Sequence, residues 1–335
     1  MTEPEGIRLM RAEMARQRGD ALASLRQAAS LAARVAAVLK HLERLVLYGI
    51  GGSHYVNRTV EPLYRTAGID CRALSASEAL MAPLPDVPRA ALFVSQSGDS
   101  GEIVDLLRKK AGRERRFGIT LSPDSRLVRA VHTVLVCAGG PELAFAATRS
   151  IVLTLAMHGA LLEALGLDMD ALRAVLEADE SADIEPASAA LGDCDAILFS
   201  GRHVLQGVAQ SGALSLMELA RVPAIGLETG QFRHGPFEFL RPGVGVVLLR
   251  SAGPDFASVA PAAATALEAG CKTVVFDAAT GPLPHGCVRV PVPGSAGIAA
   301  AAGILLALQP LNIALALRRI PQGAGTPLRT SKVTR

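Results

Sequence analysis

The sequence predicts an α/β protein built from two tandem, doubly wound parallel sheets. Short apolar runs typical of buried strands alternate with stretches of helical spacing along most of the 335 residues. The alternation begins twice, because the run Glu43–Gly49 is matched by the run Asp195–Gly201 about 152 residues later. Strands that alternate with helices form parallel sheets through right-handed βαβ connections. We therefore expect one sheet in each half of the chain.

The later elements of the two halves also correspond in order. In each half, the first strand is followed by a loop, a helix, a short segment that carries a glutamate, and then two further apolar runs. These segments are Ser75–Glu78, Ala90–Val94 and Phe117–Leu121 in the first half, and Gly226–Glu228, Val244–Leu249 and Thr273–Phe276 in the second.

Four parts are expected along the chain: an N-terminal helical arm (1–39), a first subdomain (40–165), a second subdomain (185–315) and a polar C-terminal tail (321–335). The halves should contain long helices over Glu142–Leu165 and Ala296–Leu317. The second of these is long enough to span a membrane, but Gln309, Pro310 and Asn312 interrupt its middle. A buried packing helix is therefore expected, and no membrane association.

Composition excludes several classes of function. Half of the residues are apolar and 19% are charged, as in globular proteins. The net charge of +3 and the absence of Trp argue against a nucleic-acid partner. The five cysteines are dispersed, which indicates free thiols in a reducing compartment, and the isolated histidines indicate no metal site. Because the N-terminus lacks the apolar segment of a signal peptide, a cytoplasmic location is expected.

The most informative segment is the hydroxyl-rich loop Ser95–Ser100, which lies between an apolar strand and a helix over Glu102–Lys110. The first turn of a helix offers free N–H groups and the positive end of the dipole, so hydroxyl groups there can hold a phosphate. Asp99 or Ser100 is expected to cap the helix. An ordinary capped loop without a ligand is the alternative interpretation.

A second loop, Gly49-Ile-Gly-Gly-Ser-His54, also follows a predicted strand. It resembles a dinucleotide-binding fingerprint, but His54 occupies the position of the third glycine, and a broken fingerprint is weak evidence. Ligands of open parallel sheets bind outside the carboxyl ends of the strands. Both loops are therefore expected at one edge of the sheet.

Four segments occur in this order: Gly51-Gly52-Ser53, Ser95–Ser100, Glu218 followed by Arg233–Pro236, and Ser331–Thr334. Together they resemble the sugar isomerase (SIS) family, whose best-known member domain is the isomerase half of glucosamine-6-phosphate synthase. The resemblance runs from about residue 40 to the C-terminus and implies two flavodoxin-like three-layer sandwiches. It also implies that the 6-phosphate of a hexose is held by Gly52, Ser53, Ser95, Gln96, Ser97 and Ser100.

The same resemblance implies the catalytic groups, with no cofactor and no metal. Glu218 would move a proton between C1 and C2 of the sugar, and it lies in a mostly apolar helical stretch that can desolvate a carboxylate. His234 would assist ring opening and would come from a neighbouring subunit of a homodimer with shared active sites. Lys332 would close over the sugar. An exposed glutamate, a loop histidine and a solvated terminal lysine are the ordinary alternatives.

Two departures from the synthase shape the expected activity. Ser215 stands where the synthase has a lysine, and no cysteine precedes Cys71 to serve a glutaminase domain. We therefore expect a deaminase that converts glucosamine 6-phosphate to fructose 6-phosphate and ammonia. The alternatives are another phosphosugar aldose–ketose isomerase, a deglycase for a glycated amino acid phosphate, and a non-catalytic phosphosugar sensor. A sensor would ordinarily carry a DNA-binding domain, for which the N-terminal arm is short.

Overall fold

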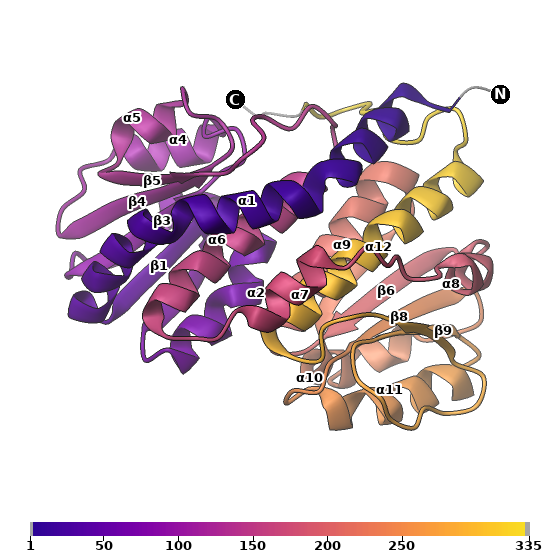
Figure 1. The fold of residues 1–335 in the computed structure, drawn as a ribbon. Helices are drawn as coiled ribbons and strands as arrows, with labels where there is room; N and C mark the ends of the chain where they lie inside the picture. Colours follow the sequence, from indigo (N-terminus) through magenta and orange to yellow (C-terminus); the bar gives the residue numbers. More distant parts are fainter. Residues whose placement is uncertain (1–2, 332–335) are drawn as a thin grey trace. The chain divides into compact units, whose positions relative to one another are not determined.

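The computed structural model describes residues 3–331 and divides them into two compact units (Figure 1). The first unit comprises residues 11–177 and 328–331, and the second unit comprises residues 3–10 and 178–327. Helix α1 (Glu5–Leu42) contributes to both units. The predicted boundaries of arm, subdomains and tail remain a prediction.

Each unit contains one five-stranded sheet, and every strand pair is parallel. The first sheet has the order β2-β1-β3-β4-β5 and the second the order β10-β9-β8-β6-β7. Numbered from the first strand of its own unit, each sheet therefore follows the same order, which confirms the predicted repeat. The strands are β1 (Arg44–Gly49), β2 (Asp70–Ser75), β3 (Arg89–Val94), β4 (Glu114–Thr120), β5 (Thr133–Val136), β6 (Ala196–Gly201), β7 (Ala224–Glu228), β8 (Val244–Arg250), β9 (Lys272–Asp277) and β10 (Val288–Pro291).

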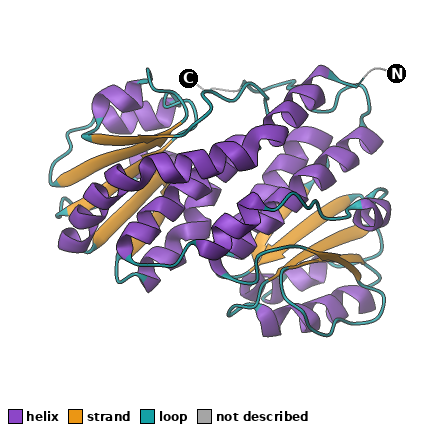
Figure 2. Ribbon diagram, in the orientation of Figure 1, coloured by secondary structure: helices purple, strands orange, loops and turns teal. Residues whose placement is uncertain are grey.

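Helices cover both faces of each sheet, so that each unit has three layers (Figure 2). In the first unit, α3 packs on α4 and α2 packs on α6; in the second, α12 packs on α8 and α9, and α10 packs on α11. The helices are α2 (Gly52–Thr66), α3 (Ala76–Met81), α4 (Gly101–Arg108), α5 (Arg126–Ala130), α6 (Arg149–Leu165), α7 (Asp170–Glu177), α8 (Glu185–Leu191), α9 (Leu205–Ala220), α10 (Thr229–Arg233), the 3-10 helix η1 (Pro236–Phe239), α11 (Phe256–Glu268) and α12 (Gly297–Arg319).

Two helices of the described chain, α1 and α12, are long and apolar enough to cross a membrane. The most apolar window of α12 is 89% buried inside the protein. Asn312, in the middle of this helix, is buried and donates a hydrogen bond to the carbonyl of Gly212 in α9. The polar interruption is thus a contact between helices, and α12 is the predicted packing helix.

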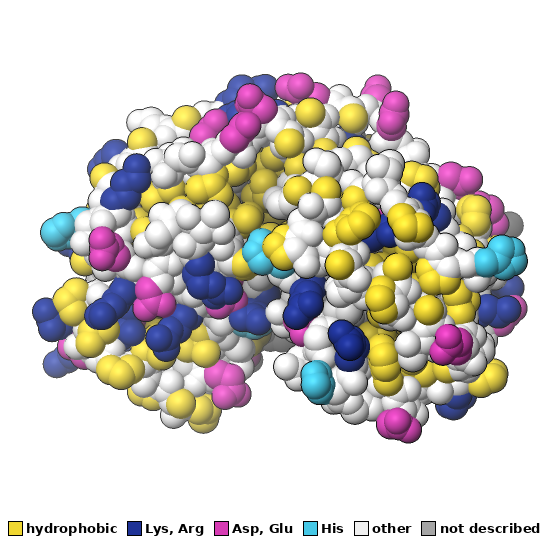
Figure 3. Space-filling view, turned by 90° about the horizontal axis from the view of Figure 1, so that it is seen from below, with side chains coloured by type: hydrophobic (Ala, Val, Ile, Leu, Met, Phe, Trp, Pro, Cys, Tyr) yellow, Lys and Arg dark blue, Asp and Glu magenta, His cyan; other side chains and the backbone are white. Residues whose placement is uncertain are grey.

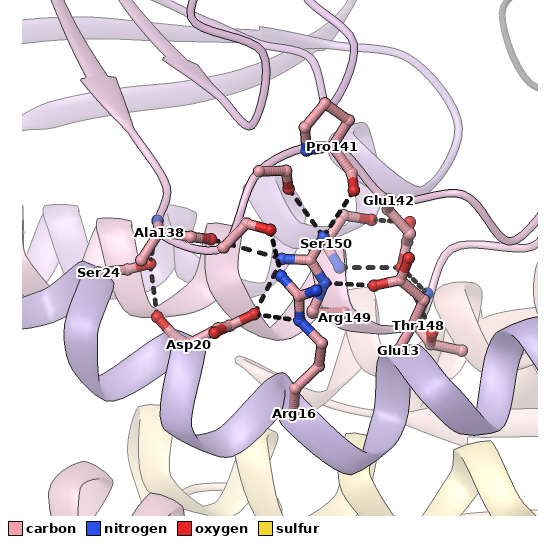
Figure 4. Close-up of polar contacts among 12 residues, drawn as sticks. Glu13, Arg16, Asp20, Ser24, Ala138, Pro141, Glu142, Thr148, Arg149 and Ser150 are labelled. Atoms are coloured by element: carbon pink, nitrogen blue, oxygen red, sulfur yellow. Dashed lines mark hydrogen bonds and ion pairs between the residues drawn. The ribbon is translucent and has the colours of Figure 1, made fainter.

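The helix predicted over Glu142–Leu165 begins seven residues later, at Arg149. The prediction of its start was wrong because the Glu142 carboxylate accepts hydrogen bonds from Thr148 and Ser150 and holds the preceding segment as a loop. Arg149 is fully buried and pairs with Glu13 and Asp20 of α1 (Figure 4). This ion cluster fastens α1 to the loop that follows β5.

Candidate functional site

The topology of the first sheet brings the two predicted phosphate loops together. Strand β1 lies between β2 and β3. The chain passes from β1 to β2 on one side and then crosses back to β3 on the other side, so a topological switch point lies between β1 and β3. Tyr48 is in register with Phe93. The loop with Gly52 and Ser53 and the loop Ser95–Ser100 therefore start from neighbouring strands at the carboxyl edge, as predicted.

Hydrogen bonds within the serine loop fix its shape. The Oγ atoms of Ser95 and Ser100 lie 3.2 Å apart, and the amide of Gly98 donates to Ser95 Oγ at 3.1 Å. The amide of Asp99 donates to Ser97 Oγ at 3.1 Å. Ser95 is buried, whereas Ser97 and Ser100 are half-buried. The loop therefore presents several hydroxyl groups around one turn of backbone without adding charge.

The amino end of α4 lacks the side-chain cap that the sequence predicts. Ser100 occupies the N-cap position, but its side chain makes no capping hydrogen bond. Asp99 instead accepts hydrogen bonds from the amide and the Nε of Arg126. Partial burial acts to raise the pKa of the Asp99 carboxyl, but the hydrogen bonds from Arg126 outweigh it and hold this pKa below its usual value. The capping prediction was wrong, and the first amides of α4 are left available for an anion.

A cavity of about 750 Å³ borders the serine loop on the β4 side. Ser97 lines it, together with Ser122, Ser125 and the Asp99–Arg126 pair. Ser125 is buried and lies against Gly98, and its Oγ has no hydrogen-bond partner among the residues that the structure describes. Sequence reasoning missed this second hydroxyl group, although Ser122-Pro-Asp-Ser125 directly follows the apolar run of β4 and could have indicated it.

The predicted proton carrier, Glu218, lies in the second unit, in the last turn of α9. The helix consists mostly of apolar residues. Of the two residues next to Glu218, Leu219 is buried, whereas Met217 is 43% exposed. Glu218 itself is half-buried. The exposure of Glu218 is therefore intermediate between the buried carboxylate of the prediction and the exposed glutamate of the alternative interpretation.

His234 is exposed and follows the short helix α10, beyond the carboxyl end of β7. Helix α9 begins four residues after β6 ends and finishes four residues before β7 begins, so it runs antiparallel to the strands. Glu218 therefore lies toward the amino edge of the second sheet and His234 at its carboxyl edge. One chain does not bring these two side chains together within the second unit.

The second sheet repeats the topology of the serine loop but not its chemistry. The loop after β8 starts with Ser251, whose amide donates to Asp255 Oδ2 at 2.6 Å and whose hydroxyl donates to Asp255 Oδ1. Asp255 is 1% exposed. The Asp255 carboxylate thus accepts hydrogen bonds from the amide and hydroxyl donors of this loop, whereas no carboxylate among the described residues does so in the serine loop of the first unit.

The predicted site residues therefore fall into two sets. Gly52, Ser53, Ser95, Gln96, Ser97 and Ser100 share one edge of the first sheet, and Glu218 and His234 belong to the second unit. Lys332 lies outside the described residues. Within residues 3–331, no group of three or more His, Cys, Asp and Glu side chains is placed to hold a metal ion.

None of the protein-family models matches the chain. Among curated proteins, the chain is 30% identical over 222 residues to the glutamine–fructose-6-phosphate aminotransferase (isomerizing) of Methanothermobacter thermautotrophicus, covering 64% of this chain and 38% of that protein. It is 26% identical over 238 residues to the Zymomonas mobilis enzyme of the same name, covering 65% and 39%. The chain thus spans well under half the length of these relatives.

Solved structures share the fold over nearly the whole chain. The C-terminal domain of glucosamine-fructose-6-phosphate aminotransferase from Francisella tularensis superposes with a TM-score of 0.81 at 18% identity, covering 93% of this chain and 96% of that domain. Tagatose-6-phosphate ketose/aldose isomerase from Escherichia coli gives 0.80 at 19% identity, with 98% of both chains covered. Glucosamine-6-phosphate deaminase from Thermotoga maritima gives 0.68 at 18% identity, covering 94% and 99%.

Proposed function

Because this chain has the fold of the sugar isomerase family and shares sequence with its isomerase domains, we propose that it is a phosphosugar isomerase that also releases ammonia. The substrate is glucosamine 6-phosphate, and the products are fructose 6-phosphate and ammonia. The observation that carries this proposal is the serine loop at the switch point of the first sheet, next to an uncapped helix.

In the proposed reaction, the serine loop holds the 6-phosphate and leaves the sugar carbons free to react. His234 transfers the protons that open the ring between O5 and O1. The Glu218 carboxylate then removes the proton from C2 and returns it to C1, while a second proton passes from the amino group to O1. Together these transfers convert the C1 aldehyde to a hydroxymethyl group and the C2 amine to an imine. Water adds to C2, and ammonia leaves. One water is consumed for each ammonia released.

The position of His234 supports a homodimer with shared active sites, and the free cysteines support a reducing compartment such as the cytoplasm. Glu218 and His234 lie toward opposite edges of the second sheet in one chain. A histidine from a second copy can supply the ring-opening group that the same copy does not place beside its own glutamate.

Ser215 favours a second candidate, an aldose–ketose isomerase that acts on a phosphosugar without an amino group. Ser215 lies one turn before Glu218 on α9, where the related synthases have a lysine. A serine brings no positive charge to this turn of the helix, so a reaction at the amino group of the sugar would proceed without the cationic side chain that the synthases have there. In this case the chain would interconvert the aldose and the ketose and would release no ammonia.

The decisive experiment is an ammonia-release assay with glucosamine 6-phosphate, and with galactosamine 6-phosphate and fructose 6-phosphate as comparators. We expect ammonia from glucosamine 6-phosphate and none from fructose 6-phosphate. If no amino sugar phosphate yields ammonia while an aldose phosphate is isomerised, the second candidate replaces the first. Turnover of none of these sugars would leave the phosphosugar sensor.

Substitution of Glu218 tests the proton carrier directly. We expect Glu218→Gln to abolish turnover, by at least about 1,000-fold, and to leave the affinity for the phosphosugar within a few-fold, because the amide cannot accept the C2 proton. The matched control is Glu268→Gln, an exposed glutamate at the end of α11. An unaltered rate in Glu218→Gln would mean that another group moves the proton.

A further inference from the structure

A cavity of about 350 Å³ opens on the first unit away from the serine loop. Several of its lining residues mark the amino edge of the sheet: Arg89 and Glu114 are the first residues of β3 and β4, and Lys109 and Lys110 belong to the turn that leads into β4. We call this hollow the amino-edge cavity. Its charged lining residues are Arg89, Lys109, Lys110, Arg116, Asp86 and Glu114, so cations outnumber carboxylates by four to two.

Two buried guanidinium groups in this cavity share one carboxylate. Arg89 Nε lies 3.2 Å from Glu114 Oε1 and Arg116 Nε lies 3.5 Å from Glu114 Oε2, with both arginine side chains less than a tenth exposed. Neither Nε has a hydrogen bond of acceptable geometry. Arg89 also donates to the Pro85 carbonyl, and Arg116 donates to the Leu107 and Lys110 carbonyls. The cluster still keeps one positive charge in excess and two Nε donors that are unsatisfied among the described residues, and a nearby anion would stabilise it.

Two aromatic rings lie beside these cations. The rings of Tyr48 and Phe93 have centroids 5.0 Å apart, and the guanidinium of Arg116 lies 5.7 Å from the centre of the Phe93 ring. Leu84 and Leu106 also line the cavity. Burial raises the pKa of the Tyr48 hydroxyl, which donates to Glu114 at 3.3 Å, so the hydroxyl remains protonated. The lining thus has an apolar side and a cationic side.

The positive charge extends along the same edge. A second hollow of about 210 Å³ shares Leu84 and Arg89 with the amino-edge cavity and adds Arg44 and Arg72 against Asp70. In the face of the molecule shown in Figure 3, dark blue Lys and Arg side chains gather at the left of the view. The positive electrostatic potential of these side chains raises the local concentration of anions.

We propose that the amino-edge cavity is a second ligand site, which binds a small organic anion with a compact apolar or aromatic body and one carboxylate or phosphate group. The acid group lies close to the guanidinium groups of Arg89 and Arg116 and to the ammonium groups of Lys109 and Lys110, and the apolar body lies toward Tyr48 and Phe93. The volume is at the lower end of the range for small-molecule sites, which limits the ligand to about the size of one aromatic ring with its acid group. Tyr48 and Phe93 lead directly into the two phosphate loops, so a bound ligand is placed to influence them.

The test is a calorimetric titration with phenyl phosphate, benzoate and uncharged phenol. A Ser97→Ala/Ser100→Ala variant of the full chain serves as the background, because it removes the hydroxyl groups of the serine loop. We expect this variant to bind one equivalent of phenyl phosphate or benzoate and to bind phenol at least about tenfold more weakly, since phenol brings no charge to the cations. The stronger of the two acids identifies the acid group.

Variants on the rim separate charge from folding. Adding Lys109→Ala/Lys110→Ala should weaken binding about tenfold, because two ammonium groups are removed. Lys40→Ala, which removes an exposed lysine of α1, is the matched control and should leave the affinity unchanged. Thermal melting checks that each variant is folded.

The site is disproved if the serine-loop background binds neither acid at millimolar concentration, or if the Lys109→Ala/Lys110→Ala change leaves the affinity as it was. Equal affinity for phenol and the two acids would also overturn it. The proposed deaminase activity is tested separately by ammonia release and does not enter this titration.

Discussion

At the scale of single residues, the first unit depends on polar groups that burial makes costly to leave unpaired. Arg149 is fully buried and also donates to the carbonyls of Gly140 and Pro141, at 2.8 and 3.0 Å (Figure 4). His158 is equally buried, and its two ring nitrogens lie 3.0 Å from the Tyr64 hydroxyl and 3.2 Å from Asn57 Oδ1. Since Asn57 Oδ1 is an acceptor, Nε2 carries the proton and Nδ1 accepts from Tyr64.

Removing the charge of Arg149 should destabilise the protein strongly. We expect Arg149→Met to lower the free energy of unfolding by about 3–5 kcal/mol, because the buried Glu13 carboxylate loses its cation and Asp20 keeps only Arg16. Urea denaturation measures the change. The comparison is Arg173→Met, whose ion pair with Glu163 is partly exposed and should cost no more than about 1 kcal/mol. Equal losses in the two variants would contradict a special role for the buried cluster.

His158 should make stability depend on pH. Burial lowers its pKa from 6.5 to about 3 in the folded protein. Below pH 6.5 the unfolded chain therefore binds a proton that the folded chain does not, and stability falls as the pH falls from 6.5 toward 3. Between pH 7.5 and 5.0 this histidine should account for a loss of about 2 kcal/mol.

Urea denaturation at both pH values tests this assignment. The His158→Gln variant should lose less stability on acidification than the wild type, by about that same 2 kcal/mol. Tyr64→Phe should lower stability at every pH but retain the pH dependence, because the imidazole stays buried. A pH dependence that is the same in His158→Gln and in the wild type would show that other groups cause it.

At the scale of elements, apolar runs predicted β1, β3 and β4 of the first sheet and β6, β8 and β9 of the second, because burial repeats along each of them, but they did not predict the edge strands β5 and β10. Features decided by one tertiary contact were not predictable. Arg126 is 27 residues from Asp99 and draws it away from α4, and Glu142 delays the start of α6. The Ser122–Ser125 loop joined the site through the β3–β4 pairing, which single-sequence patterns do not reveal. The role of Lys332 stays a prediction.

Gly98 illustrates how the serine loop depends on backbone that only glycine allows. Its φ is +66°, and an added Cβ would lie 2.1 Å from Ser125 Oγ. We expect Gly98→Ala to cost about 2–4 kcal/mol of stability, from left-handed strain and overpacking together, and to weaken phosphate binding. Thermal unfolding and phosphate titration measure the two effects.

Two other glycines separate these contributions. Gly140 has a φ of +72° but open space around its Cα, so Gly140→Ala should cost only the strain, about 1–2 kcal/mol. Gly19 lies within helix α1 with nothing near it, and Gly19→Ala should stabilise the protein by up to about 1 kcal/mol. If Gly98→Ala costs no more than Gly140→Ala, the contact with Ser125 is unimportant.

At the scale of the whole molecule, one topology occurs twice and has diverged in chemistry. The first copy keeps an open hydroxyl loop, and in the second copy Asp255 fills the corresponding donors. The sequence repeat predicted the shared topology, because both copies bury the same pattern of strands. It did not reveal the divergence, because one serine and one aspartate at the right spacing are common in ordinary turns.

Subunit mixing tests the shared active site of the proposed dimer. Glu218→Gln and His234→Ala chains should each be inactive alone. After random re-association, about half of the dimers contain one chain of each kind and hold one intact site out of two, so about a quarter of the wild-type activity should return. Activity that stays absent after mixing, with mixed dimers verified by mass, would place Glu218 and His234 of the same chain in one site.

Helix α1 has a consequence for biosynthesis. Ile7 and Met10 are almost fully buried in the second unit, and the backbone of Gly6 lies against that of Gly325. The first turns of α1 therefore leave the ribosome long before Gly325, which packs against them. Until Gly325 has been translated, this apolar stretch lacks part of its native packing, and a nascent-chain chaperone that shields it would prevent premature aggregation.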